Sequence, residues 1–337
     1  MRAYPPLDLV PFSDRLIPQA ATLLAARQAR LRSFDPLLPG GLEAVPASEA
    51  LLGREWGKAQ AVGAAALSSD GMLAFMIASP KTDPVWGRNM WVHSSGLALV
   101  DGVPPSMITD LYAELGAAWV REGIFYHFVL TPVAEPGVVQ AWFALSFGIE
   151  QVHARADLRS LEPPPPPAAG LTIRRAGPED GETLAGFSEL IWRELLRAPV
   201  WGITLPESVA ETRHGYAELA TDPSASVWMA EVNGRVVAIQ GYWEHDDPDP
   251  VLVPAKAVTV SVVSTLPEER GQGYQAALTR HGMWQAHLAG YEYCETDWRS
   301  ANRNIARMLP RFGFRPIAYR LVRRVDARIA WASRLNG

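Results

Sequence analysis

The chain has 337 residues, 48% of them hydrophobic and 20% charged, with a formal net charge of −5. This length predicts two domains, each able to bury its own core, and the composition is that of an ordinary globular protein. The acidic balance and three scattered lysines argue against nucleic acid as a partner, and no 18-residue apolar run is present for a membrane span.

The single cysteine, Cys294, excludes an internal disulfide and a multi-thiolate metal site. It lies in the apolar run 291–296, which favours a buried packing residue over a nucleophile. The seven histidines are scattered, and the common zinc-protease, serine-hydrolase and Walker A motifs are missing, so we expect chemistry without a metal. The N-terminus has no apolar signal-peptide core, which predicts a cytoplasmic location.

The first half of the chain predicts a domain over residues 1–158. Its expected elements, in chain order, are a helix around Pro18–Arg30, a hairpin through Asp70-Gly71, a strand over Met90–Leu99 and a helix over Leu111–Val120.

A proline-rich stretch follows, centred on Pro163–Pro167. Consecutive prolines favour polyproline II and cannot enter a helix or a central strand. We therefore expect a semi-rigid interdomain linker over residues 159–170. Recognition of the prolines by an SH3-like partner is the alternative.

The second half predicts a domain over residues 171–337. The dipeptide Asn233-Gly234 suits a type I′ turn and predicts a hairpin between its flanking apolar runs. The elements expected in chain order are a strand Leu171–Arg175, helices Thr183–Leu196 and Pro206–Leu219, strands Val227–Val232, Arg235–Trp243 and Ala257–Val263, a helix Tyr274–Leu288, a strand Tyr291–Trp298, a helix Asn302–Arg311 and a strand Ala318–Val325.

An Arg-Gly-x-Gly sequence, Arg270–Gly273, connects an apolar strand to a helix. Glycines allow positive φ, and a loop of this kind turns backbone N–H groups and a helix N-terminus toward one point. The arrangement favours binding of a diphosphate. An ordinary strand-to-helix turn is the alternative interpretation.

This loop, with Asn302 and Gly313-Phe314 following it, resembles the acetyl-CoA-binding core of the GNAT superfamily of N-acetyltransferases. The likeness is good over Val258–Arg324 and looser over Leu171–Trp243. It implies an α+β fold with a mixed twisted sheet flanked by helices, and acetyl-CoA as acyl donor. Two residues depart from the family pattern: Gln275 replaces a Gly or Ala, and Leu309 replaces a Tyr that protonates the leaving thiolate.

The first half repeats the second at a constant offset of 167 positions through its last third. For example, Gly123 falls on Gly290, and Phe147 falls on Phe314. The chain thus resembles tandem GNAT proteins. The offset sets Val103-Pro104-Pro105-Ser106 on Arg270–Gly273 and Glu135 on Asn302. Prolines have no N–H to donate and a carboxylate repels phosphate, so we predict that the first copy has lost its cofactor site.

The resemblance also implies roles for individual residues. The backbone of Val263, Ser264 and Thr265 would pair with the pantetheine arm, with the Val263 N–H toward the thioester oxygen. The diphosphate would lie on Arg270, Gly271, Gln272, Gly273, Tyr274 and Gln275, with Asn302 at the CoA arm. For Gln275, a structural role at the start of the helix is an equal alternative to a phosphate contact. Asn302 is also a good helix N-cap.

The general base and acid are less well defined. Glu244 and His245 follow a strand expected near the amine, and either residue is a candidate proton relay, a solvated acidic loop being the alternative. Since Leu309 cannot act as an acid, Tyr274, Tyr291, Tyr293 or solvent would have to do so. Trp298 and Trp201 are candidates for an aromatic substrate wall.

Together these features predict an acyl-CoA-dependent N-acyltransferase, most simply an N-acetyltransferase. Its acceptor would be a small-molecule or protein amine, with no nucleic-acid or membrane partner, and the protein would be a monomer or homodimer. The alternative function is a CoA-binding sensor with little or no turnover.

Overall fold

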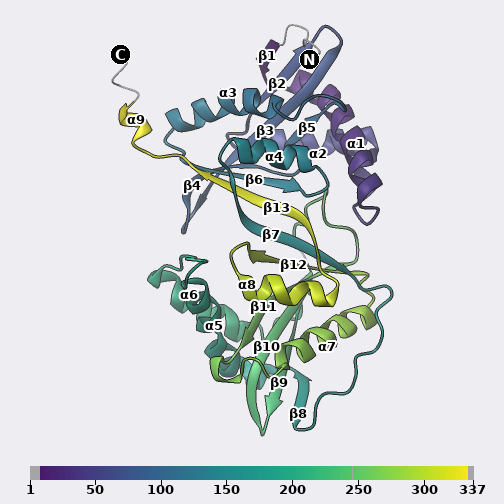
Figure 1. Ribbon diagram of the computed structural model, residues 1–337, viewed down its shortest axis with the longest axis vertical. Coiled ribbons are helices and arrows are strands. Elements are labelled where there is room, and N and C mark those ends of the chain that lie inside the picture. The colour runs from purple at the N-terminus through teal and green to yellow at the C-terminus, as the bar shows by residue number, and fades with distance from the viewer. Residues whose placement is uncertain (1–7, 245, 333–337) are drawn as a thin grey trace. The chain divides into compact units, whose positions relative to one another are not determined.

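The structure is a computed structural model that describes residues 8–244 and 246–332. It divides into two compact units, each built from more than one stretch of the chain. Of the described residues, the first unit contains 8–151, 248–254 and 317–332, and the second contains 152–244, 246–247 and 255–316. Each unit has a mixed β-sheet with helices packed on both faces, as the sequence predicts (Figure 1).

The first unit takes its elements from both ends of the chain. They are β1 (Asp8–Pro11), α1 (Ile17–Phe34), α2 (Val45–Trp56), β2 (Val62–Ser68), β3 (Gly71–Asp83), β4 (Gly87–Val92), β5 (Leu97–Leu99), α3 (Met107–Arg121), β6 (Tyr126–Pro132), α4 (Pro136–Ala144), the start of β7 (Gly148–Asp157), most of β13 (Arg315–Arg324) and α9 (Ile329–Ala332).

Both faces of the first sheet are buried. Along β3, Ala74 and Met76 pack with α3 and α4, whereas Phe75 and Ile77 pack with α1 and α2. Successive strand residues point to opposite faces, so a run in which every residue is apolar gives a sheet with helices on both sides. The strand order is β1-β2-β3-β4-β6-β13, antiparallel except for the β4–β6 pair.

The second unit contains the elements of the predicted acetyltransferase domain apart from most of its last strand. They are the end of β7, β8 (Leu171–Arg175), α5 (Gly181–Leu195), α6 (Val209–Glu218), β9 (Ala225–Val232), β10 (Arg235–Glu244), β11 (Ala257–Thr265), α7 (Tyr274–Leu288), β12 (Tyr293–Arg299) and α8 (Arg303–Met308).

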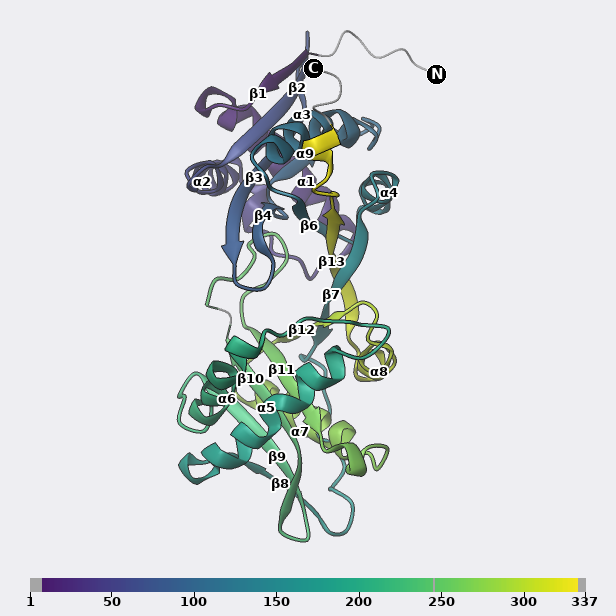
Figure 2. The same cartoon turned by 90° about the vertical axis from the view of Figure 1, so that its left-hand side faces the viewer.

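In the second unit α5 and α6 cover one face of the sheet and α7 covers the other (Figure 2). The strand order is β12-β11-β10-β9-β8, and only the β11–β12 pair is parallel. The predicted hairpin turn is confirmed, since Asn233 and Gly234 both have positive φ, 51° and 74°. No helix among the described residues is long and apolar enough to cross a membrane.

The predicted duplication is confirmed by the element bounds. At the offset of 167 positions, α3 (Met107–Arg121) coincides with α7 (Tyr274–Leu288), and β6 (Tyr126–Pro132) coincides with β12 (Tyr293–Arg299). The last strands, β7 and β13, also coincide end to end. Each copy therefore has the same order of elements through its last third.

The units do not follow the continuous boundaries 1–158 and 171–337 expected from the sequence. The last strand of the second copy, β13, pairs antiparallel with β6 of the first copy, from Ala318 opposite Pro132 to Arg324 opposite Tyr126. Residues 152–157 of β7, the last strand of the first copy, belong to the second unit. The two copies have exchanged their final strands, which their shared sequence pattern makes possible.

A short excursion, residues 248–254, also enters the first unit. Its Val251 and Leu252 are buried among α1 and α2, and Asp249 accepts a 2.6 Å hydrogen bond from Ser94 Oγ and a 2.9 Å bond from the Val251 N–H. Burial raises the pKa of Asp249. The excursion is therefore a structural part of the first core.

Candidate functional site

A β-bulge interrupts the pairing of β10 with β11 at the centre of the second sheet. Gly241 lies opposite Ser261 and Ile239 lies opposite Ser264, so Val262 and Val263 together face the single residue Gln240. Val262 has φ of +53°, a conformation that is uncommon for a β-branched residue and that clusters at functional sites. The extra residue turns the end of β11 away from its regular course.

The parallel pairing of β11 with β12 ends just before this bulge. Within the described part of the chain, the pairing covers Ala257–Thr259 opposite Tyr293–Glu295, followed by a 2.9 Å bond from Thr296 Oγ1 to the Val260 carbonyl. Both strands continue for several residues beyond that point. The backbone of Val263–Thr265 consequently has one edge on β10 and the other available for an added strand-like ligand.

The glycine loop follows β11 directly and leads into α7. Gly271 and Gly273 have φ of +84° and +87°, and no atom lies within 4 Å of the position that a Cβ would take at either residue. Ala277 N–H donates to the Gly273 carbonyl at 3.0 Å, so the N–H groups ahead of it form the open first turn of α7. Left-handed glycines beside a helix N-terminus make a cradle for an anion, and a diphosphate fits this donor set.

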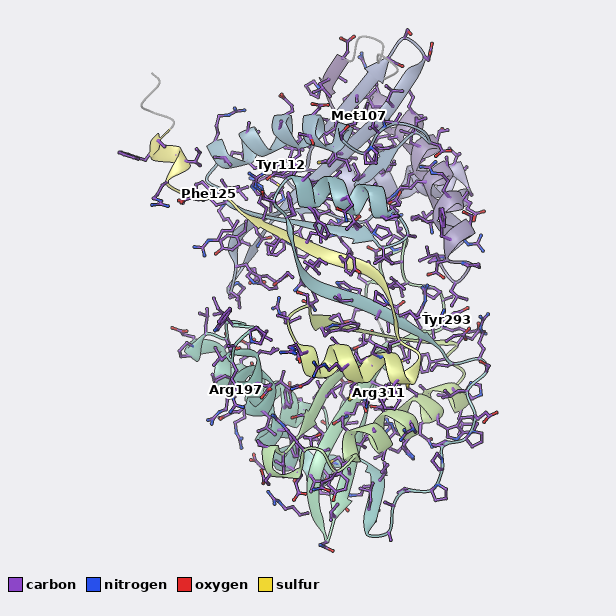
Figure 3. All side chains as sticks on the ribbon, in the orientation of Figure 1. Met107, Tyr112, Phe125, Arg197, Tyr293 and Arg311 are labelled. Atoms are coloured by element: carbon purple, nitrogen blue, oxygen red, sulfur yellow. The ribbon has the colours of Figure 1, made fainter. Side chains whose placement is uncertain are left out.

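Arg270, the cation expected at this loop, is paired with a carboxylate. Its Nη1 donates to Glu194 Oε2 at 3.1 Å, and Glu194 also accepts a 3.4 Å bond from Arg197, which follows α5 (Figure 3). The neighbouring Glu268 accepts a 2.6 Å bond from Arg235. The loop is thus electrically balanced as the structure stands, and a phosphate would compete with Glu194 for Arg270.

Gln275 connects the start of α7 to the sheet. Its Oε1 accepts a 3.0 Å bond from Thr265 Oγ1, and its Nε2 donates to Gln240 Oε1 at 3.2 Å. Thr279 Oγ1 also donates to Gln240 Oε1, and Gln240 is completely buried. The structure therefore favours the structural role of Gln275. Gln240 was missed at the sequence level, although a glutamine inside the apolar strand 235–243 was a visible signal.

Asn302 and Leu309 both have structural contacts. Asn302 caps α8, with its Oδ1 accepting from the Ile305 N–H at 3.4 Å, a long bond that leaves a CoA contact compatible with the geometry. Leu309 is 2% exposed and contributes packing only. The helix after β12 accordingly supplies no acid at this position.

Of the two candidate bases, the structure describes Glu244, which lies away from the bulge. Glu244 is opposite Val258, three residues along β10 from Gly241 and thus about 10 Å away. It accepts a 2.7 Å bond from Tyr291 Oη, which raises the pKa of Tyr291 to about 12. His245 lies outside the described residues. A catalytic role for either residue stays a prediction.

The other residues considered as an acid, an aromatic substrate wall or a nucleophile also belong to the second unit. Tyr293 lies beneath the Arg159 guanidinium, 5.3 Å from the ring centre to Cζ, and Trp298 is 7% exposed. Trp201 is 71% exposed in the α5–α6 connection. Cys294 is buried, and burial raises the pKa of its thiol, which confirms a packing role rather than a nucleophile.

In the first unit, the residues at the positions equivalent to Asn302 and to the start of α7 form hydrogen bonds within the protein. Glu135 accepts two bonds from Arg27 Nε, at 2.9 and 3.0 Å, and Arg27 Nη1 donates to the Ser94 carbonyl at 2.5 Å. At the start of α3 the Met107 and Ile108 N–H groups donate to the carbonyls of Pro104 and Pro105, both at 3.0 Å. The N–H groups equivalent to those that the second unit offers to an anion therefore form internal hydrogen bonds here.

Three solved structures resemble the chain over almost its whole length. A GCN5-related N-acetyltransferase from Sphaerobacter thermophilus is 17% identical with a TM-score of 0.57, covering 95% of this chain and 96% of that one. A GCN5-related glucosamine N-acetyltransferase region of a fungal multi-domain GH3 β-N-acetylglucosaminidase is 15% identical with a TM-score of 0.54, covering 95% of this chain and 38% of that one. A tandem GNAT protein from the clavulanic acid biosynthesis pathway, without acetyl-CoA, is 14% identical with a TM-score of 0.51, covering 96% and 99%.

No family model matches the sequence, and no curated protein matches it. The structural likeness establishes the fold: the chain has the mixed α/β fold of GCN5-related N-acetyltransferases in its tandem form. Because the sequence identities are only 14–17%, the likeness shows the fold alone. A proposal about activity has to rest on the residues of the site.

Proposed function

We propose that this protein is an acyl-CoA-dependent N-acyltransferase, most simply an N-acetyltransferase, with its donor site in the second unit. The observation that carries the proposal is the conjunction of three features: the bulge at Val262–Val263 of β11, the end of the pairing of β11 with β12, and the glycine cradle between β11 and α7. An ordinary strand-to-helix turn requires the glycines alone, whereas a thioester with a diphosphate requires all three.

In this proposal each part of the chain holds one part of the donor. Gly271, Gly273 and the first turn of α7 hold the diphosphate, and the free edge of Val263–Thr265 pairs with the pantetheine arm. The Val263 N–H holds the thioester oxygen, which stabilises the charge that develops there during attack. When bound, acetyl-CoA supplies a thioester, and transfer replaces its C–S bond by a C–N bond to the amine. The acceptor is an amine of a small molecule or a protein.

Proton transfer does not depend on the helix that contains Leu309. A CoA thiol has a pKa of roughly 8.5, like free cysteine, so its thiolate leaves tolerably without a strong acid. Because Leu309 is buried and apolar, protonation by solvent is the simplest route.

The test is release of free CoA thiol from acetyl-CoA against a panel of amines. We expect release with at least one amine, and its loss in the Gly271→Pro/Gly273→Pro double variant, since proline removes two N–H donors and cannot adopt positive φ. If CoA binds but no amine produces thiol, the protein is instead a CoA-binding sensor. The absence of an acid at Leu309 favours that second function.

A further inference from the structure

A chain of polar side chains connects the middle of the second sheet to the start of α7. Gln240 interrupts the apolar run of β10 and is 0% exposed. Its Oε1 accepts a 3.2 Å bond from Gln275 Nε2, and Gln275 Oε1 accepts a 3.0 Å bond from Thr265 Oγ1. The chain therefore leads from β10, through the first turn of α7, to the last residue of β11, entirely within the second unit.

Neither packing nor stability explains the amide of Gln240. Among the described residues its Nε2 is buried without a hydrogen-bond partner, which is unfavourable in a closed core and calls for a reason. A leucine of similar size would avoid this unpaired donor. Thr279, which also donates to Gln240, has a second acceptor in the Gln275 carbonyl at 2.9 Å. The side chain that depends on Gln240 is therefore that of Gln275.

The chain ends beside the part of β11 that the sheet constrains least. Val262 and Val263 together face Gln240, and the extra residue of a bulge has no partner in the ladder. The direction of the Val263 N–H consequently depends on what holds the strand just after the bulge. Thr265 is two residues further on, and its bond to Gln275 ties the end of β11 to α7.

We propose that Gln240 is a positioning residue of the donor site, which acts through Gln275 and Thr265 to align the Val263 N–H with the first turn of α7. The inference rests on the proposed function. There the first turn of α7 holds the diphosphate and the Val263 N–H holds the thioester oxygen, so two ends of one ligand need a fixed separation. A misplacement of about 1 Å in such a contact can lower a rate about 100-fold.

The experiment follows the carbonyl band of acetyl-CoA, isotope-labelled at the thioester carbon, by infrared spectroscopy on the full chain. A hydrogen bond to the oxygen lowers the stretching frequency, so we expect a downward shift on binding to the native protein. In Gln240→Leu and in Thr265→Val we expect most of this shift to be lost and kcat to fall about 10- to 100-fold. The affinity for CoA should change less than about twofold, because the glycine loop is untouched.

Three further variants separate positioning from packing. The double variant Gln240→Leu/Thr265→Val should be no worse than either single one, because both break the same chain. Thr265→Ser keeps the hydroxyl and should keep the native band and rate. Thr279→Val removes a buried hydroxyl that bonds to Gln240 outside the chain to Thr265, so it should lower stability in denaturant unfolding and leave the band in place.

A native band in Gln240→Leu, or equal losses in Gln240→Leu and Thr279→Val, would overturn the inference and leave the proposed function in place. If Gln240→Leu does not fold, a native band in Thr265→Val overturns it in the same way. If the band shifts in the native protein but no amine is acylated, the proposed function fails, and the band in the variants decides the inference. If the native protein binds acetyl-CoA without a shift, the inference alone fails, and if it binds none, both fail.

Discussion

At the scale of single residues, Glu194 sets the charge balance of the candidate donor site. It pairs with Arg270 at 3.1 Å, so phosphate must displace a carboxylate before it gains that cation. A partly exposed ion pair is worth about 0.2–1 kcal/mol, so we expect Glu194→Gln to tighten CoA binding by about 1.4- to 5-fold in calorimetry. Glu189→Gln is the matched control, because Glu189 pairs with Arg193 on the same helix. Unchanged or weaker binding in Glu194→Gln would contradict this account of Arg270.

His127, in β6, makes the free energy of unfolding depend on pH. Its Nε2–H donates to the Ile124 carbonyl at 3.1 Å, which leaves Nδ1 to accept from Tyr112 Oη at 2.7 Å (Tyr112 is labelled in Figure 3). Burial lowers the pKa of His127 to about 4, against about 6.5 in an unfolded chain. Between these values the unfolded chain binds a proton that the folded chain does not, so the free energy of unfolding decreases as the pH falls from 6.5 to 4.

Replacing His127 should therefore flatten the acid side of the stability curve. We expect His127→Gln to be less stable at pH 7, because two buried hydrogen bonds are disturbed, and to lose less stability than the native chain between pH 6.5 and 4. Denaturant unfolding at a series of pH values measures this. The surface substitution His214→Gln is the control, and an identical pH slope in His127→Gln and the native protein would refute the assignment.

At the scale of elements, the contact between α7 and β10 depends on a glycine. A Cβ at Gly282 would lie 2.3 Å from the ring of Tyr242, which is 3% exposed and whose Oη donates to the Thr279 carbonyl at 3.4 Å. We expect Gly282→Ala to destabilise the protein by about 1–3 kcal/mol through overpacking, measured by denaturant unfolding. Gly186→Ala in α5, where a Cβ meets no atom within 4 Å, should be neutral or stabilising. Equal stability of the two variants would argue against this packing.

Local chemistry explains which elements could be predicted. The bounds predicted for the helix 274–288 agree with the observed ones. Glycines stand beside both of its ends in the sequence, and Gly273 and Gly290 take left-handed φ in the structure. The helix α2 (Val45–Trp56) was missed, since its proline at the second position and its glycine, Gly53, conceal the periodicity. The bulge at Val262–Val263 has no sequence signal, because valine is a favourable strand residue whether or not it is bulged.

At the scale of the whole molecule, the exchange of final strands could not be predicted either. An alternating pattern fixes which face of a strand is buried but not which neighbour it pairs with. Because β7 and β13 are equivalent strands of the two copies, each can pair in the sheet position that the other would otherwise take. The same limit applies to the candidate site: the sequence identifies the glycine loop, whereas the contacts of Glu194 and Gln240 with it are visible only in the tertiary structure.

The exchange predicts that residues 1–158 do not fold well alone. Without β13 the strand β6 loses its antiparallel partner, and without the excursion 248–254 the core loses Val251 and Leu252. An exposed central edge of this kind favours aggregation. We expect poor solubility and no cooperative unfolding for the fragment, with recovery when residues 315–325 are appended by a flexible linker. A monomeric fragment with a cooperative transition of its own would contradict the exchanged arrangement.

The central claim is that one donor site lies on the glycine loop of the second unit, and titration of the full chain with CoA tests it most directly. The account predicts one CoA per chain, no binding in the Gly271→Pro/Gly273→Pro variant with an unchanged far-UV spectrum, and full binding in Pro104→Gly/Pro105→Gly. Two equivalent sites, no binding to the native protein, or binding that survives the double proline variant would contradict it.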